Sequence, residues 1–241
     1  MLRRASTTET APASVEPDAL CLAARQGQAK AQGKLGFMYA SGLGVPQDYV
    51  QARQWWEKAA ARGDAQAQAH LGWLYVEGKG VPQSFDKAIH WFRLAAQHGV
   101  VSAQCNLGWC YFQGKGVSQD YTKARHWWVK AAAQGDTQAQ FQLGSLYANG
   151  QGVPQNHKEA VRWYRLAAEQ GNAVAQASLG LMYVQGHGVP QDFVQALTWL
   201  SLAEAQGDKQ GAEVCDMIAK KTSPAQIDEA QRLAREWKPK K

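Results

Sequence analysis

The dipeptide Leu-Gly recurs at a fixed interval of 36 residues along most of this 241-residue chain. It occurs at five equivalent places, which begin at Leu35, Leu71, Leu107, Leu143 and Leu179. A period of this length is typical of proteins that stack small structural units, each of which contacts mainly its neighbours. The period therefore predicts one elongated repeat domain, where length alone would suggest one or two globular domains.

Each unit contains two segments with the apolar spacing of an α-helix. In the first segment, Leu35, Met38 and Tyr39 fall on one helical face, and in the second Trp55 and Ala59 do the same. One such pair of helices cannot bury its apolar face alone, so the core is expected to form between stacked units. The predicted core positions are Leu35, Tyr39, Trp55, Leu71, Tyr75, Trp91, Leu107, Tyr111, Trp127, Leu143, Tyr147, Trp163, Leu179, Tyr183 and Trp199.

Turn and capping residues mark the ends of both helices. A Gly-x-Gly-Val-Pro sequence follows the first helix in four units, and Ser118 replaces its proline in the third. Its first glycine suits the left-handed position that ends a helix, and the proline prevents continuation. Good N-cap residues precede the second helix at Asp48, Ser84, Asp120, Asn156 and Asp192. The next first helix can be capped by Asp64, Asp136, Asn172 and Asp208, but not by Val100.

The two ends of the chain depart from this pattern. Residues 1–15 are predicted to be a disordered leader, because they are polar and lack the apolar core of a signal peptide. Residues 16–221 are predicted to form the repeat domain, with full units at about 27–62, 63–98, 99–134, 135–170 and 171–206 and a degenerate unit from 207. Residues 222–241 are predicted to form a capping helix, opened by Ser223 and Pro224, and a basic tail.

These motifs resemble the Sel1-like repeat family, which is related to the tetratricopeptide repeats. The residues that carry the resemblance in one unit are Gly63, Ala67, Leu71, Gly72, Tyr75, Gly78, Gly80, Val81, Ala88, Trp91, Ala95 and Ala96. The resemblance covers residues 27 to 207 and implies an all-α fold, a right-handed α/α superhelical solenoid. It also implies an adaptor role, in which the inner groove or the ends hold other proteins.

One branch of that family is rich in cysteine, secreted and associated with β-lactam binding or hydrolysis. Its signature is a pair of cysteines eight residues apart, which joins the second helix of one unit to the first helix of the next. The equivalent positions here are Ala60/Gln68, Ala96/Gln104, Ala132/Gln140 and Ala168/Gln176. A hydrolase or β-lactam-binding protein of this kind is therefore the disfavoured alternative.

The sequence predicts no catalytic residue, no cofactor and no metal site. The glycine-rich turns lack the Lys-Ser/Thr and the preceding strand of a phosphate loop. His90 and His126 occupy equivalent positions in adjacent units, where we expect them to be too far apart to share a zinc ion and to face solvent. Cys110 is expected to be a buried core residue, and Cys105 is expected to point outward. Scattered free thiols favour a reducing compartment.

A column of large side chains on the first helices is not explained by the predicted core. The residue two positions after each Leu is Phe37, Trp73, Trp109, Ser145 or Leu181. In solenoids of the resembled type, first helices line the concave surface, so this column predicts an aromatic groove for a partner. The alternative is that these rings pack between adjacent first helices as ordinary core. The predicted groove residues are Phe37, Trp73, Trp109, Phe112, Phe141, Lys34, His70, Glu77, Asn106 and Gln113.

We therefore expect a non-enzymatic, monomeric scaffold that binds a peptide or protein of unknown identity through this groove. Residues 220–241 carry seven Lys or Arg against three Asp or Glu, so four of the six net positive charges lie in the tail. No basic stripe crosses the repeats, which argues against specific nucleic-acid binding. No apolar run is long enough for a membrane span. The cytoplasm is the favoured location, and a periplasmic or secreted location requires that a leader has been removed.

Overall fold

A computed structural model of the chain describes residues 17–240, which form thirteen helices and no strand. The predicted disordered leader, residues 1–15, lies outside the described residues. The helices are α1 (Pro17–Arg25), α2 (Ala29–Ser41), α3 (Tyr49–Ala60), α4 (Ala65–Glu77), α5 (Phe85–Gln97), α6 (Val101–Gln113), α7 (Tyr121–Ala133), α8 (Thr137–Asn149), α9 (His157–Glu169), α10 (Ala173–Gln185), α11 (Phe193–Glu204), α12 (Lys209–Ala219) and α13 (Pro224–Glu236).

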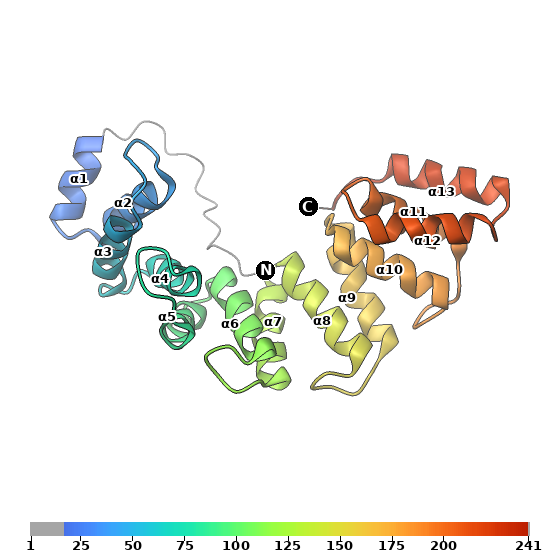
Figure 1. The fold of residues 1–241 in the computed structure, drawn as a ribbon, viewed down its shortest axis with the longest axis horizontal. Coiled ribbons are helices and arrows are strands. Elements are labelled where there is room, and N and C mark those ends of the chain that lie inside the picture. Colours follow the sequence, from blue (N-terminus) through green and yellow to red (C-terminus); the bar gives the residue numbers. More distant parts are fainter. Residues whose placement is uncertain (1–16, 241) are drawn as a thin grey trace. The chain divides into compact units, whose positions relative to one another are not determined.

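The chain divides into two compact units after Lys130, within α7. In the first unit, α2 pairs with α3 and α4 with α5, while α3 packs on α4 and α5 packs on α6 (Figure 1). Helix α1 packs on α2, as expected for a terminal half repeat. In the second unit, α8 pairs with α9 and α10 with α11, and α9 packs on α10. Each unit is therefore a stack of helix pairs, as the period predicts.

The helix ends confirm the predicted turn chemistry. The C-cap glycines Gly42, Gly78, Gly114, Gly150 and Gly186 are all left-handed, with φ between 67° and 74°. Asp48 accepts hydrogen bonds from the amides of Val50 and Gln51, and the N-caps of α4, α5, α8, α9, α10, α11 and α12 act in the same way. Val100 makes no side-chain cap bond, as predicted. These local signals fix where each helix begins and ends.

The core of each pair is built from a glycine on the first helix and a large side chain on the second. A Cβ atom added to Gly36 would lie 2.5 Å from Cδ1 of Trp56. The same relation joins Gly72 to Phe92, Gly108 to Trp128, Gly144 to Tyr164 and Gly180 to Leu200. The glycine of the recurring Leu-Gly dipeptide is thus the site of closest approach between the two helices, and the preceding leucines are all buried.

This packing corrects the predicted tryptophan core. Trp55, Trp91, Trp127 and Trp163 are only half-buried, whereas Trp56, Phe92 and Trp128, each one residue later, are essentially inaccessible. The half-buried rings lie at the seam between successive pairs: Trp55 packs on the Ala24–Leu35 cluster of α1 and α2. Trp199 is the exception, with 8% of its surface exposed. The helical spacing accommodates both neighbouring rings, so the periodicity alone could not choose between them.

Buried glutamines join each second helix to the first helix that follows it. The Gln104 Nε2 atom donates to the carbonyl oxygen of Ala96 at 3.2 Å, and Gln176 donates to that of Ala168 at 3.1 Å. Three further bonds with the same eight-residue separation link Gln32 to Ala24, Gln68 to Ala60 and Gln140 to Ala132. Because the bonded carbonyls belong to the ends of second helices, these bonds hold adjacent helix pairs together.

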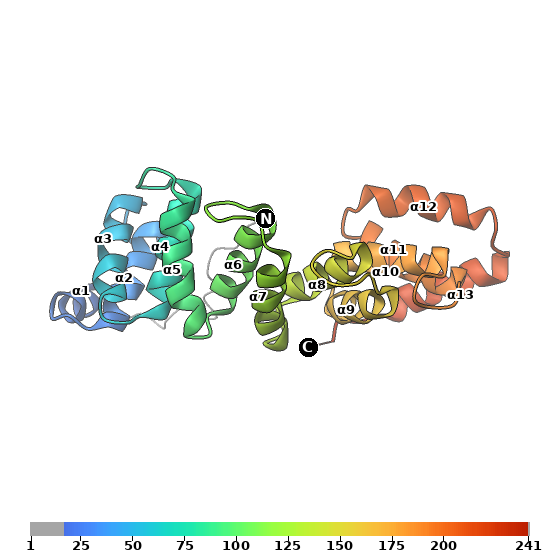
Figure 2. The ribbon, with the colours of Figure 1, turned by 90° about the horizontal axis from the view of Figure 1, so that it is seen from below.

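The C-terminal end of the second unit is capped differently from an ordinary repeat. Helix α11 packs against both α12 and α13, which lie on different sides of it (Figure 2). Ser223 and Gln226 form the predicted capping box, with Pro224 at the first turn of α13. Beyond α13, Trp237 packs edge-on against Trp199, and Lys240 forms an ion pair of 2.9 Å with Glu169. The last helix and its basic end therefore cover the second-helix side of the stack.

Candidate protein-interaction surface

The first structural element of the predicted groove is a cluster of two rings and a lysine around Trp73. The ring of Trp73, on α4, lies 6.2 Å from that of Tyr49, at the start of α3. Lys79, in the turn after α4, places its Nζ atom 4.8 Å from the Trp73 ring and 5.4 Å from the Tyr49 ring. At these distances a lysine ammonium is attracted to the faces of both rings.

The same cluster recurs one repeat later around Trp109. Its ring lies 6.5 Å from that of Phe85, and Lys115 Nζ lies 4.8 Å from the Trp109 ring and 5.2 Å from the Phe85 ring. Trp109 remains half-buried, whereas only 7% of Trp73 is exposed. Trp73 and Trp109 of the aromatic column therefore lie where successive helix pairs meet. Of these two rings, only Trp109 keeps a substantial part of its surface accessible.

Three of the predicted groove residues lie in the interior of the first unit. Only 3% of His70 and 2% of Asn106 is exposed, in addition to the 7% of Trp73. The His70 ring stacks on Trp56, with ring centroids 4.5 Å apart and planes inclined by 17°. Cys105 is also buried, so the expectation that it points outward is wrong. Helix α6 is buried at almost every position from Ser102 to Tyr111, which the sequence pattern did not indicate.

Two of the three phenylalanines of the prediction, Phe112 and Phe141, each pack on the second helix of their own repeat. Phe112 lies 5.5 Å from Trp128 and 5.4 Å from Tyr121, and Phe141 lies 5.8 Å from Tyr164. Both are half-buried. Phe141 belongs to the second compact unit, whereas the other nine predicted residues belong to the first. The other nine predicted groove residues all lie on the first helices of the first unit, α2, α4 and α6.

Of the nine predicted groove residues in the first unit, six keep accessible side chains. We call these six residues the first-helix surface. Lys34, Phe37, Trp109 and Phe112 are half-buried, and Glu77 and Gln113 are exposed at the ends of α4 and α6. Aromatic rings that are partly accessible and flanked by polar groups are enriched at protein interfaces. This arrangement can offer apolar contact and hydrogen bonds to an extended chain.

The Cys110 thiol does not resemble a nucleophilic site. All four cysteines are free, and burial raises the pKa of the Cys110 thiol to about 12. A thiol with so high a pKa carries almost no thiolate at neutral pH, and the thiolate is the reactive form. Cys110 is fully buried, as predicted.

The histidines are dispersed over the chain. His90 and His126 are exposed, and each lies edge-on to the tryptophan that follows it, at 5.2 Å. Within residues 17–240, no three His, Cys, Asp or Glu side chains are grouped so that they could hold a metal ion. None of the helices in the same range is long and apolar enough to cross a membrane.

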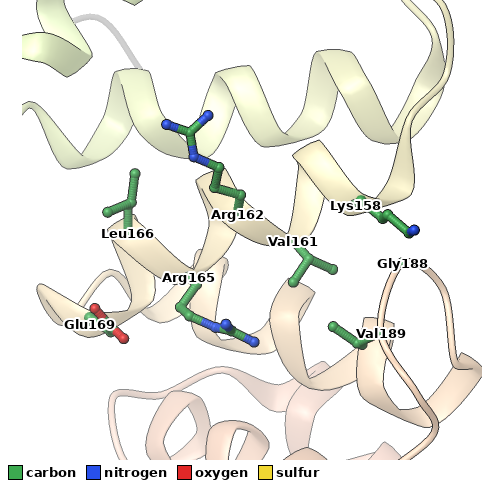
Figure 3. Close-up of a pocket in the computed structure, with 8 residues that line it drawn as sticks. All are labelled: Lys158, Val161, Arg162, Arg165, Leu166, Glu169, Gly188 and Val189. Carbon is green, nitrogen blue, oxygen red and sulfur yellow. The ribbon is translucent and has the colours of Figure 1, made fainter.

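Sequence reasoning missed a pocket between α9 and the turn that follows α10. It has a volume of about 360 Å³ and is lined by Lys158, Val161, Arg162, Arg165, Leu166, Glu169, Gly188 and Val189. Figure 3 shows Val161 of α9 facing Val189 of the turn, with Lys158 beside Gly188 at one end. The nearby His157 and His187 rings are stacked 4.7 Å apart. The lining residues are up to 31 positions apart, so only the stacking of two repeats brings them together.

The comparisons with known proteins agree with this architecture. The Sel1 repeat model matches five consecutive segments, residues 29–64, 65–100, 101–136, 137–172 and 173–208. The chain belongs to the Sel1 repeat family. The matched segments begin two residues after the predicted units and have the same period. Sel1 repeat proteins are commonly scaffolds for protein interaction and generally lack enzymatic activity. A comparison with curated proteins gives no match.

Solved structures of other Sel1 repeat proteins have the same fold. The c5321 protective antigen of uropathogenic Escherichia coli is 40% identical, with a TM-score of 0.83 over 91% of this chain. This chain spans about half (48%) of that antigen. A Sel1 repeat protein from Oxalobacter formigenes is 30% identical, with a TM-score of 0.77, and the match covers 94% of this chain and 89% of that one. A putative Sel1 repeat protein from Klebsiella pneumoniae is 27% identical, with a TM-score of 0.53 over 83% of this chain and 98% of that one.

Proposed function

We propose that this Sel1 repeat chain is a non-enzymatic scaffold that binds a peptide segment of a partner protein through its first-helix surface. The observation that supports the proposal is the half-buried Trp109, held by Phe85 and Lys115 at a seam of the first unit. A ring fixed in this way loses little conformational entropy when it is covered, which favours its use as an anchor.

Polar groups at the same face complete the proposed site. Glu77 and Gln113 end their helices in exposed positions, and Lys34 is half-buried near the start of the stack. An extended peptide exposes its backbone N–H and C=O groups, which such side chains can satisfy. His70 and Asn106 are buried and are therefore assigned a packing role, not a contact with the partner.

The proposal is tested by site-specific crosslinking followed by a binding measurement. A photoreactive amino acid in place of Gln113 should capture a partner in cells, whereas the same residue in place of Val129, which is 44% exposed on α7, should not. The identified partner is then titrated against purified wild-type protein and the Trp109→Ala variant. We expect Trp109→Ala to weaken binding by a factor of about ten or more, as for an interface anchor. Equal capture at both positions, or unchanged affinity of the variant, would contradict the proposal.

Unfolding of the variant has to be separated from loss of binding. Circular dichroism and the melting temperature of Trp109→Ala are measured beside those of Trp128→Ala, which removes a fully buried ring from the same repeat. We expect the Trp128 variant to be clearly less stable than the Trp109 variant, because a cavity in the core costs about 3–5 kcal/mol. If both variants unfold alike, Trp109 is part of the core, and the proposed surface does not exist.

A further inference from the structure

The α9 pocket has an apolar floor with positive charge at its edge. Val161 and Val189 supply the floor, and only 4% of Val161 is exposed, whereas Leu166, which is 38% exposed, projects on the same side of α9 as Arg162 (Figure 3). Lys158 and Arg165 extend from α9 on the side of the turn that carries Val189, whereas Arg162 projects away from it (Figure 3). The pocket therefore presents apolar surface and two cations to the same ligand.

The ion pairs around the pocket compensate some of these charges and leave others free. Arg162 is paired with Glu159 at 3.3 Å, and Glu169 is paired with Lys240 at 2.9 Å. Arg165 donates to the hydroxyl of Tyr183 at 2.7 Å, which leaves its positive charge unbalanced because the partner is neutral. Lys158 is exposed and makes no ion pair with any residue of the described range 17–240. Two positive charges at the rim are thus open to an anion.

The equivalent site on α5, two repeats earlier and in the first unit, shows that the charge is not a consequence of the repeat. There Ile89 and Leu94 replace Val161 and Leu166, and Arg93 donates to Tyr111 at 2.8 Å as Arg165 does to Tyr183. Asp86, however, stands where α9 has Lys158. The Arg–Tyr bond is therefore a structural feature of both sites, whereas Lys158 reverses a charge. Among the five second helices, only α9 has a cation at both positions; the residue pairs are Val50/Glu57, Asp86/Arg93, Thr122/Val129, Lys158/Arg165 and Val194/Ser201.

We propose that the α9 pocket binds an acidic peptide segment in which carboxylates flank one apolar side chain. The apolar side chain would lie over Val189 and the exposed edge of Val161, and the carboxylates would accept charge-assisted hydrogen bonds from Lys158 and Arg165. A volume of about 360 Å³ is enough for one large side chain, which sets the size of the recognised element. This site lies in the second unit and is independent of the first-helix surface proposed above.

Fluorescence polarisation with short labelled peptides tests the site directly. The probes are fluorescein-labelled pentapeptides with the sequences Gly-Glu-Leu-Glu-Gly, Gly-Lys-Leu-Lys-Gly and Gly-Glu-Ser-Glu-Gly, titrated with the full chain. We expect saturable binding of the first peptide, which weakens as salt rises, and at least about tenfold weaker binding of the other two. Equal binding of the lysine or serine peptide, or no saturation by the first at millimolar protein, would overturn the proposal.

Matched variants separate recognition from stability. Lys158→Asp gives α9 the negative charge that α5 has at Asp86. It should weaken binding of the first peptide about tenfold without lowering the melting temperature of the protein. Arg165→Gln should weaken it as well, whereas Arg93→Gln loses the same kind of Arg–Tyr bond in the first unit and should leave peptide binding unchanged. The proposal is wrong if Lys158→Asp binds like the wild type, or if Arg93→Gln weakens binding as much as Arg165→Gln. Octanoate that competes with the peptide at equal concentration would assign the pocket to small carboxylates instead.

Discussion

The amide of Gln176 donates a hydrogen bond to the backbone carbonyl of Ala168 at 3.1 Å, and Gln176 is completely buried. Its side-chain oxygen accepts in turn from Gln206 at 2.8 Å, so both ends of the buried amide are satisfied. The bond joins the end of α9 to the start of α10. It occupies one of the positions at which the cysteine-rich Sel1-like branch is expected to place a disulfide. A polar contact thus holds the helix pairs together where a covalent bond would be expected in that branch.

Replacing Gln176 should destabilise the second unit. Gln176→Ala leaves the Ala168 carbonyl buried without this partner, which costs about 1–3 kcal/mol. Gln206→Ala removes only the exposed half of the network and should cost less. Urea unfolding followed by far-ultraviolet circular dichroism measures both variants. A Gln176 variant as stable as the wild type would mean that the hydrogen bond contributes nothing net.

The same pair of positions should accept a disulfide. In the double variant Ala168→Cys with Gln176→Cys, the two thiols should oxidise to one bond and stabilise the protein by about 2–3 kcal/mol relative to its reduced form. Thiol titration and unfolding with and without reductant measure both effects. The single variant Ala168→Cys, which leaves only the native thiols such as Cys110 as possible partners, serves as the control and should not form a disulfide. Failure to oxidise would show that this chain positions the two helices differently from the cysteine-rich branch.

Two glycines of α2 should respond to the same substitution with opposite signs. Gly36→Ala places a methyl group 2.5 Å from the buried Trp56 ring, and overpacking of this kind costs about 1–3 kcal/mol. A Cβ at Gly33 meets only the Asp64 carboxylate, at 3.4 Å, so Gly33→Ala should stabilise the helix by about 0.5–1 kcal/mol. Thermal melts of the two variants give the comparison. Stabilisation by Gly36→Ala would refute the close approach of the two helices.

Cys110 should resist alkylation in the folded protein, whereas the half-buried Cys21 should react. The reason is that burial excludes the reagent and raises the pKa of the Cys110 thiol from 9.0 to about 12. Iodoacetamide labelling at pH 8, read by peptide mass spectrometry, distinguishes the two residues, and labelling in urea provides the control. Equal native labelling of both residues would contradict the burial of α6.

The same shift makes the stability depend on pH in a defined direction. The thiol of the unfolded chain ionises at lower pH than the buried thiol, so the unfolded state is favoured as pH rises from about 9 to about 12. Below pH 9 both states are protonated and the group has no effect. The loss of stability across this window should therefore be smaller in Cys110→Ala than in the wild type.

Several features of the fold could be predicted because they depend on neighbours in the sequence. The αL glycines, the N-caps such as Asp48 and the capping box at Ser223 all act within a few residues of the chain. The 36-residue period predicted the stack, since each unit repeats the same apolar spacing. Burial of Leu71 followed from that period as well.

The choice between adjacent rings required the tertiary structure. Trp55 and Trp56 are one residue apart, and a helical pattern places both near the apolar face. Only the glycine at position 36, on another helix, decides that Trp56 fills the core and that Trp55 lies at the seam. In the same way, α4 and α6 are buried by neighbouring helix pairs, which removed His70 and Asn106 from the predicted surface.

The amino-acid sequence by itself determined the repeat, its helix boundaries and its family, because those depend on local spacing, capping and recurrence. The tertiary structure decided which side chains remain accessible and which distant residues meet. The α9 pocket illustrates the difference, since Lys158 and Val189 are adjacent only because the turn after α10 packs on the start of α9. Accessibility is set by what covers a side chain, and in a stack of helices that cover comes from the next repeat.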